Sequence, residues 1–293
     1  MIPSQSRLSG IRLMIQASAA FSFMALCVKL ASRSLPSLEV VFFRSLIGTL
    51  MILPVMLRKR APLLGKERGV MALRGISGFL ALSLHFYTIA HLPLGTAVLL
   101  NYTSPIFSTL LAILLLKEPP RPVPVGAVLV SFAGVFLLAH GRVEHWNLMI
   151  FLGLLSAVFA SIAYVSIRAL RRRESPLTVI FYFTGISTIG SLFFLPFGFA
   201  RPGIKEWLLL AGVGTGSFYG QLWLTIGLRR APASLLAPFF YLTPLLSFLY
   251  GLIFFGDVIS AQSVAGALLI IAGGSAVSYV ETKRKIVTLN RPA

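Results

Sequence analysis

A few polar and charged side chains lie inside long apolar stretches of this sequence, where they could bind a solute or carry a proton. Arg44 lies about six residues inside such a stretch, and a central arginine costs roughly 2.5 to 3.5 kcal/mol to insert into a membrane. His85 lies in another stretch, and an imidazole can exchange a proton near neutral pH. No HExxH, GxSxG or paired-aspartate pattern accompanies them, so these residues predict solute binding and not enzyme catalysis.

Arg44 has two interpretations. Its guanidinium could contact an anion or carboxylate at the outer mouth of the protein, or it could extend towards the outer face and pair with Glu39. Lys29 and Glu39 flank the same short outer loop, so the three residues could form an ion-pair cluster that acts as an outer gate. The alternative is that all three are interfacial charges with no part in transport.

A second polar group surrounds a proline in each half of the chain. Asn101 and Ser108 share a helix face, and Pro105 interrupts the backbone hydrogen bonds between them. Pro244 has the corresponding position later in the chain, below Tyr241. Paired broken helices at corresponding positions favour a binding site there, although kinks in packed helices explain such prolines equally well.

The remaining candidates are aromatic, imidazole or amide side chains. Tyr219 and Trp223 share a helix face and could form a stacking wall for a planar substrate, or they could pack against core and lipid. Tyr164 and Gln16 suit a water-filled cavity or a hydrogen bond between helices, and His85 could equally bond a neighbouring helix carbonyl. The predicted substrate cavity consists of Gln16, His85, Asn101, Tyr102, Ser108, Tyr164, Tyr219, Trp223 and Tyr241.

The sequence predicts no metal centre and no cofactor. Cys27 is the single cysteine and lies in an apolar run, so neither a disulfide framework nor a cysteine metal site is available. All eight acidic residues fall at predicted helix ends or in loops, which argues against a proton relay through a buried carboxylate. His85 or Glu39 would have to replace such a carboxylate.

Membrane helices must position these residues. Of the 293 residues 57% are hydrophobic and 12% are charged, whereas soluble domains carry about 25% charged residues. Ten segments are long enough to cross about 30 Å of hydrocarbon as helices. The predicted spans are 11–31, 38–57, 70–90, 95–116, 124–140, 148–168, 177–200, 206–228, 232–255 and 261–281.

A net charge of +18 would suggest nucleic-acid binding in a soluble protein, but here its distribution predicts a membrane topology. Of the 26 lysines and arginines, 20 fall in the termini and loops on one side of the predicted bundle, five fall on the other side, and Arg44 remains within a helix. Lysine and arginine accumulate on the cytoplasmic side. We therefore expect a bacterial inner-membrane protein with both termini in the cytoplasm. Its expected partners are a small-molecule substrate and the lipid bilayer, with no nucleic acid.

The sequence repeats itself at an offset near 140 residues. The stretch 101–118 corresponds to 240–257 at an offset of 139, with matching tyrosine, proline, serine and acidic residues. This predicts a first five-helix repeat over 1–140, a second over 147–285 and a cytoplasmic tail over 286–293. Because five is odd, the second repeat must enter the membrane from the opposite face. The predicted fold is thus an all-α integral membrane protein of ten transmembrane helices in two inverted repeats, an architecture of transporters.

These repeated stretches resemble the drug/metabolite transporter superfamily, specifically its EamA-type ten-helix transporters. The resemblance covers nearly the whole chain and rests on LLLKE and IFFGD, on the FFR at 42–44 and on the glycines Gly126, Gly134, Gly266 and Gly274. Asp257 departs from the glutamate usual in that family. The resemblance implies a small-molecule carrier with a central cavity, and it does not specify the substrate.

We therefore expect a secondary transporter that moves a small metabolite by alternating access. Export of amino acids or related metabolites is the first interpretation, and uptake of a nucleotide-like or vitamin-like metabolite is the alternative. An integral-membrane enzyme and a scaffold are more remote interpretations. The sequence leaves both monomer and homodimer open, because the glycine-bearing segments 124–140 and 261–281 could pack within one chain or between two.

Overall fold

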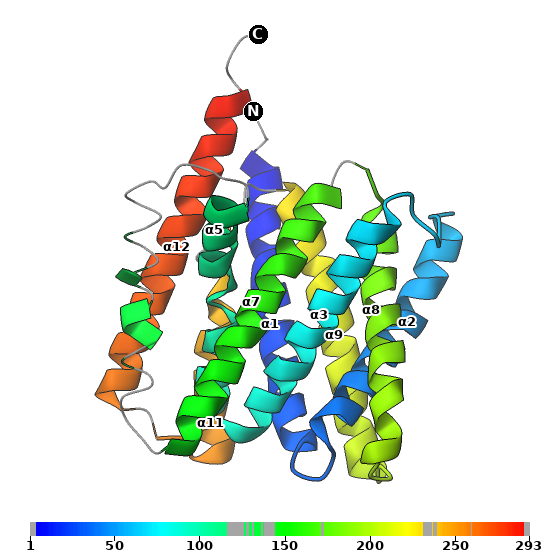
Figure 1. Ribbon diagram of the computed structural model, residues 1–293, viewed down its shortest axis with the longest axis vertical. Coiled ribbons are helices and arrows are strands. Elements are labelled where there is room, and N and C mark those ends of the chain that lie inside the picture. The colour runs from blue at the N-terminus through cyan, green and yellow to red at the C-terminus, as the bar shows by residue number, and fades with distance from the viewer. Residues whose placement is uncertain are drawn as a thin grey trace.

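A computed structural model describes residues 4–115, 126, 129–130, 132–135, 137, 144–170, 173–230, 236, 239–258 and 260–289. Every regular element within these residues is a helix, and the helices lie side by side in a bundle (Figure 1). The predicted helix over 124–140 lies largely outside the described residues, and Glu118 lies entirely outside them.

The first half of the chain forms helices where its apolar runs are longest. A proline directly precedes two of these helices, Pro36 before α2 and Pro93 before α4. Proline suits the start of a helix because it has no backbone N–H that would need a partner there. The predicted single span 95–116 consists of two helices, α4 and α5. The described helices are α1 (Ser4–Ala31), α2 (Ser37–Arg58), α3 (Arg68–His91), α4 (Leu94–Asn101) and α5 (Ser104–Leu115).

The second half contains α7 (Glu144–Leu170), α8 (Pro176–Phe194), a short 3-10 helix η1 (Leu195–Phe197), α9 (Ile204–Arg230), α11 (Leu242–Phe255) and α12 (Ala261–Leu289). By length and composition, five stretches of the described helices can cross a membrane: Leu8–Ala31, Ser37–Arg58, Arg68–His91, Leu148–Ile167 and Pro176–Phe197. Two shorter apolar helices are Leu242–Phe255 and Ala261–Gly273.

The two halves run through the bundle in opposite directions. The helix α1 begins at the end of the bundle where α12 finishes, and α7 begins at the other end (Figure 1). The first helix of each half therefore enters from a different end. Which end faces the cytoplasm stays a prediction from the lysine and arginine distribution.

The two halves pack against each other through equivalent pairs of helices. The most extensive contacts are those of α1 with α9 and of α3 with α7, which are the same pair once the halves are exchanged. A Cβ atom added to Gly75 would lie 2.2 Å from Ile186, and one added to Gly214 would lie 2.5 Å from Ile47. Gly214 and Ile186 follow Gly75 and Ile47 by the same 139 residues that separate Tyr102 from Tyr241. One close helix contact thus occurs twice, with the partners swapped.

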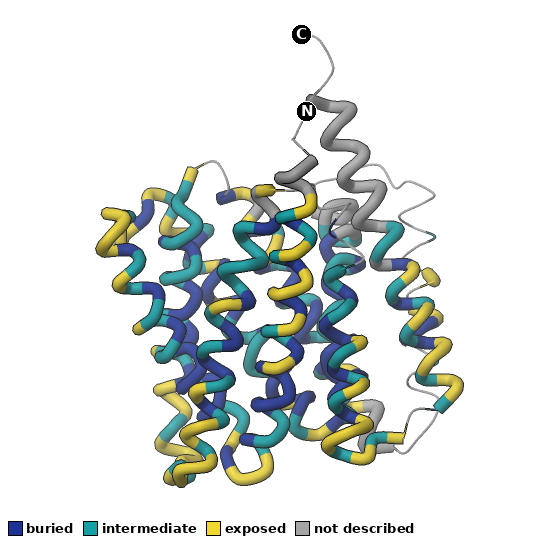
Figure 2. Tube along the Cα trace, turned by 180° about the vertical axis from the view of Figure 1, so that it is seen from behind, coloured by how far each residue is buried: buried dark blue, intermediate teal, exposed yellow. Residues whose placement is uncertain are grey.

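Burial follows the helix faces. Buried residues lie on the sides that neighbouring helices cover, and exposed ones extend along the outer sides for most of the bundle's length (Figure 2). Large apolar side chains such as Ile189, Phe193 and Leu208 are among the exposed ones. Such a surface would be insoluble in water and suits lipid. Gly134 lies against the backbone of Gly266 within the same chain, so these two glycines pack within one protomer.

Candidate functional site

Two helix breaks face each other between the halves. The helix α4 ends at Asn101, and Tyr102 lies in the turn before α5. Residues 239–240 are helical, and Tyr241 lies in the turn before α11. The ring centroids of Tyr102 and Tyr241 are 6.2 Å apart. Positions that correspond between the two halves therefore meet at their helix breaks.

The breaks lie at the tyrosines and not at the prolines to which the sequence points. Pro105 and Pro244 each lie in the first turn of the helix that follows the break. A proline fits there because the first turn has no intrahelical partner for its missing N–H. The prolines therefore start the second helix of each pair, and the tyrosines occupy the turn between the two helices.

Hydroxyl groups bind backbone carbonyls beside both breaks. The Thr103 hydroxyl donates to the Leu100 carbonyl over 2.6 Å at the first break. At the second break, the Ser18 hydroxyl of α1 donates to the Phe239 carbonyl over 2.8 Å. Irregular backbone at membrane depth requires such partners or a water-filled space. Asn101 adds a bond to α7, where its amide donates to Ser156 over 3.1 Å.

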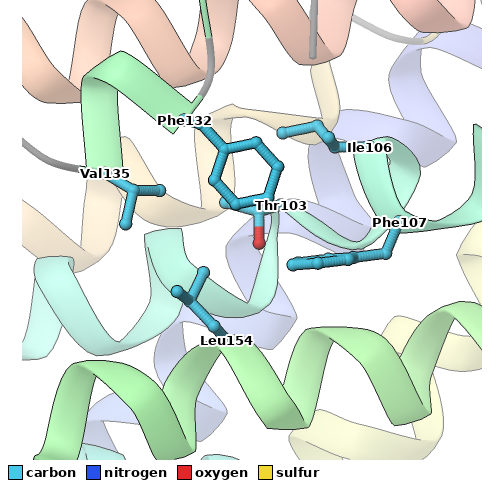
Figure 3. Close-up of a pocket in the computed structure, with 6 residues that line it drawn as sticks. All are labelled: Thr103, Ile106, Phe107, Phe132, Val135 and Leu154. Carbon is cyan, nitrogen blue, oxygen red and sulfur yellow. The ribbon is translucent and has the colours of Figure 1, made fainter. Parts of the chain in front are cut away.

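A small apolar hollow lies beside the first break. Its empty volume is about 150 Å³, and it is lined by Thr103, Ile106, Phe107, Phe132, Val135 and Leu154 (Figure 3). The hydroxyl of Thr103 is already bonded to Leu100, so the hollow offers no free polar group. It is a packing gap and not a place for a polar metabolite.

Two arginines lie buried against one aromatic ring. Arg44 of α2 is 4% exposed and Arg74 of α3 is 7% exposed. Their guanidinium carbons lie 5.1 and 4.2 Å from the ring centroid of Phe183 on α8, hence within about 9 Å of each other. In the described part of the chain, Nε and Nη1 of Arg44 and Nε of Arg74 have no hydrogen-bond partner.

This arginine pair is costly as it stands. A central arginine costs roughly 2.5 to 3.5 kcal/mol on insertion scales, and a desolvated cation–π contact returns about 2 kcal/mol. Two contacts with one ring therefore do not offset two buried charges that also repel each other. An arrangement of this kind is suited to an anion, because guanidinium donors form strong, planar bonds to anionic oxygens.

Sequence reasoning missed Arg74, which it assigned to the charged loop before α3. The signal that could have identified it is helical spacing. Arg74, Gly78, Ala81 and His85 follow each other at intervals of four, three and four residues and are all buried, so they form one inner face of α3. His85 is 8% exposed, and its Nδ1 has no hydrogen-bond partner among the described residues.

Tyr164 is an exposed side chain on an otherwise buried face of α7. Gly153, Ala157 and Ala160 share its helix face at the same four, three and four spacing and are buried, and Gly153 lies against Leu100 of α4. Tyr164 is nevertheless 51% exposed. Its hydroxyl lies within electrostatic range of Arg74 and of Tyr102. Tyr164 thus connects the arginine pair to the helix breaks.

We name these residues the central cluster: Arg44, Arg74, Tyr102, Tyr164, Phe183 and Tyr241. Four helices (α2, α3, α7 and α8) and the two turns supply its members. The hydroxyl of Tyr241 is buried without a hydrogen-bond partner in the described chain. Unbonded guanidinium and phenol donors therefore belong to the same interior cluster.

Other predicted cavity residues lie elsewhere. Gln16 lies on the exposed side of α1 with Ile15 and Phe23. Tyr219 is 43% exposed and shares the exposed side of α9 with Leu208. Its ring centroid lies 5.4 Å from that of Trp223, so these two rings contact each other as predicted from their spacing. Among the described residues, no hydrogen bond or ring contact connects Gln16, Tyr219 or Trp223 to the central cluster. Ser108 is buried in α5, beyond the first break.

The predicted outer ion-pair cluster is not assembled in this structure. Lys29 donates to the Leu92 carbonyl. Glu39 is buried, and its Oε2 accepts a hydrogen bond from the Ala200 backbone over 2.9 Å. Arg44 contacts Phe183. Lys29, Glu39 and Arg44 therefore have three different partners.

The acidic residue at the end of the second repeated stretch connects the halves. Asp257 accepts a hydrogen bond from the Leu94 backbone N–H over 3.0 Å, at the first residue of α4. A carboxylate at a helix start accepts a hydrogen bond from an N–H that has no partner within the helix. Its negative charge also interacts favourably with the positive end of the helix dipole. The described side chains contain no group of three metal-binding residues.

Comparison with known proteins assigns the chain to a family. The EamA-like transporter family matches residues 8–139 and again residues 147–279. The chain belongs to the EamA-like transporter family. The resemblance to the drug/metabolite transporter superfamily is thus confirmed.

Relatives of this EamA-like transporter are named as transporters of different compounds. The pseudopaline exporter of Pseudomonas aeruginosa is 35% identical over 272 residues, which cover 92% of this chain and 96% of the exporter. An S-adenosylmethionine uptake transporter of Rickettsia conorii is 25% identical over 253 residues and 85% of either chain. One solved crystal structure has the same fold, with a TM-score of 0.67 at 21% identity over 94% of this chain and 98% of its own.

Proposed function

We propose that this EamA-like transporter is a secondary carrier that holds a small metabolite at the central cluster and opens alternately to the two sides of the membrane. The observation that supports this most is the meeting of the two helix breaks at Tyr102 and Tyr241. Broken helices at corresponding positions of inverted repeats form the substrate sites of many transporters. Here the halves run in opposite directions, and their contacts are exchanged at a common offset.

The polar groups of the central cluster are placed to bind a solute. Arg44, Arg74 and Tyr241 carry donors without partners among the described residues, and Tyr164 is half exposed on an otherwise buried face of α7. A buried donor without a partner is costly, so a solute that supplies acceptors is stabilised there. We include His85 as a further contact, because it shares the inner face of α3 with Arg74.

Export is the direction that we propose, with amino acids or related metabolites as cargo. The exporter relative is 35% identical over nearly its whole length, whereas the relative named for uptake is 25% identical. The uptake relative supports the second candidate, an uptake carrier for a nucleotide-like metabolite. We place the protein in the bacterial inner membrane with both termini in the cytoplasm, as the distribution of lysine and arginine predicts.

Exchange in vesicles tests the carrier function. Proteoliposomes with the full chain would be loaded with a mixture of isotope-labelled amino acids and metabolites and diluted into the same unlabelled mixture. Mass spectrometry of the filtered vesicles should then show faster loss of label from at least one solute than in protein-free liposomes. Equal retention of every solute, with the protein folded and inserted, would contradict the proposal.

Two further measurements refine this test. The Gly185→Ala variant is a matched control, because a Cβ atom at Gly185 would meet nothing within 4 Å, so its exchange should equal that of the wild type. For the direction, everted membrane vesicles of cells that produce the protein should accumulate the identified solute. Accumulation only in right-side-out vesicles would favour the uptake candidate.

A further inference from the structure

The central cluster carries two positive charges that no described carboxylate neutralises. Each of the five acidic residues whose side chains the structure describes has another partner. Glu39 bonds the Ala200 backbone, Glu67 pairs with Arg173, Glu174 bonds the backbone of residues 66 and 67, Glu206 bonds Ser34 and Asp257 bonds Leu94. The described part of the protein thus leaves the arginine pair without an internal anion.

We propose that the transported metabolite carries an oxyanion, a carboxylate or a phosphate, and that Arg44 and Arg74 bind it together beside Phe183. This inference rests on the carrier function proposed above and specifies its substrate class. Both side chains are more than nine-tenths buried and have unbonded donors. A planar guanidinium matches the two oxygens of a carboxylate or phosphate and stays charged in buried space.

The surroundings of Arg74 show that its position is built into the fold. A Cβ atom added to Gly78 would lie 2.2 Å from Nη1 of Arg74 and 2.8 Å from the Phe183 ring. A glycine at position 78 therefore leaves room for the guanidinium beside that ring. The guanidinium carbons of Arg74 and Arg44 lie 4.2 and 5.1 Å from the centroid of this ring, which offers them no anionic oxygen.

An exposed side chain lies near the arginine pair. Tyr164 is half exposed on an otherwise buried helix face, and it lies within electrostatic range of Arg74. Tyr164 is thus the exposed member of the central cluster. Arg44 contacts Phe183 from α2.

Ligand-dependent unfolding tests the inference directly. The purified full chain would be heated in detergent with glutarate, with inorganic phosphate, or with sodium chloride at the same ionic strength, and unfolding would be followed by tryptophan fluorescence. At saturating concentration, glutarate or phosphate should raise the Tm by about 3 °C or more above sodium chloride. A response to glutarate alone assigns a carboxylate, and a response to phosphate alone assigns a phosphate.

The arginine variants separate binding from folding. In Arg44→Gln and in Arg74→Gln the midpoint concentration of the active probe should rise at least tenfold. The Tm without probe should equal or exceed that of the wild type, because each variant removes a buried charge that has no partner. Arg201→Gln changes an arginine that is exposed in a loop and should behave like the wild type.

A second variant keeps the test valid if an arginine variant does not fold. Gly78→Ala retains both charges but pushes the guanidinium of Arg74 away from Phe183, and it should also raise the midpoint concentration. The inference is overturned if neither probe raises the Tm above sodium chloride. It is also overturned if all three variants respond with the midpoint of the wild type.

Vesicle exchange distinguishes a failure of this inference from a failure of the carrier function. Exchange of a neutral or cationic solute that continues unchanged in Arg44→Gln and Arg74→Gln would overturn the oxyanion and leave the carrier intact. A Tm shift that depends on both arginines, without exchange of any solute, would retain the anion site and contradict the carrier.

Discussion

The two halves of the protein share a backbone arrangement but differ in charge. Tyr102 faces Tyr241, its equivalent at an offset of 139, and both are tyrosines. At the same offset the equivalent of Arg44 is Phe183, the ring that it contacts. The equivalent of Arg74 is Val213, which is fully buried. The cations of the central cluster thus belong to the first half alone.

This difference separates two requirements of a carrier. Alternating access uses two structurally related halves that move against each other, and the paired contacts of Gly75 and Gly214 show one helix contact that occurs twice. Recognition of a solute does not need symmetry. A solute bound by two arginines of one half and by tyrosines of both would have a single orientation, with its oxyanion towards α2 and α3.

The largest effect is expected when the charge difference between the halves is removed. Arg74→Val replaces Arg74 with the residue type of its counterpart in the second half, Val213. Exchange of the identified solute should fall about 100-fold, because truncating one partner of a buried charge-assisted contact costs about 2–5 kcal/mol. Initial rates in proteoliposomes measure this, with Arg201→Gln as the control. A rate within a factor of two of the wild type would remove Arg74 from the site.

Adding one methyl group to either glycine of the exchanged contact tests the scaffold. Gly75→Ala and Gly214→Ala should each lower the free energy of unfolding by about 1–3 kcal/mol, because the new Cβ would overlap Ile186 or Ile47. The loss should be larger for Gly214→Ala, where the Cβ of Ile47 itself lies at 2.7 Å. Denaturant unfolding in detergent measures both. Unchanged stability in one variant would mean that the contact is not shared by the halves.

Removing the charge of Asp257 should weaken the connection between the halves. Asp257→Asn retains a hydrogen-bond acceptor for Leu94 but loses the negative charge that interacts favourably with the positive end of the α4 dipole. We expect a loss of about 0.5–1 kcal/mol in the free energy of unfolding, measured in the same denaturant series. Arg201→Gln, in an exposed loop, is a suitable comparison. A loss of comparable size in the free energy of unfolding of Glu118→Gln would indicate that Glu118, the counterpart of Asp257 in the first half, has the same role.

The smallest effect concerns the tyrosines that are the same in both halves. Tyr102→Phe and Tyr241→Phe each remove one hydroxyl from the facing pair. Each should raise the KM for the solute about two- to tenfold, because a net hydrogen bond contributes about 0.5–1.5 kcal/mol. The two values should agree within a factor of about three. An effect confined to one tyrosine would show that the breaks are not used equally.

Some of this arrangement follows from the sequence, because it depends on local composition. Long apolar runs indicate α1, α2, α3, α7 and α8, since length and apolar content alone decide whether a helix can cross a membrane. The repeat at an offset of 139 points to the facing tyrosines. The broken helices were expected at Pro105 and Pro244, whereas a proline in a first turn follows the break.

The rest depends on which helix face points inwards, and spacing alone does not determine this. Tyr219 and Trp223 share a face as predicted, but Tyr219 lies on the exposed side of α9. Arg74 was counted with the loop before α3, because a lysine- and arginine-rich stretch precedes it. Only the packing of α3 on α8 places its guanidinium beside Phe183, next to Arg44.

Accessibility of Tyr164 from both sides of the membrane tests the central claim most directly. A Tyr164→Cys variant in a Cys27→Ser background would be exposed to a membrane-impermeant maleimide in right-side-out and in everted vesicles. We predict labelling from both sides, and slower labelling from either side when the transported solute is present. Labelling from one side only, or from both sides at a rate that the solute does not change, while exchange activity persists, would contradict a site that opens alternately at the central cluster.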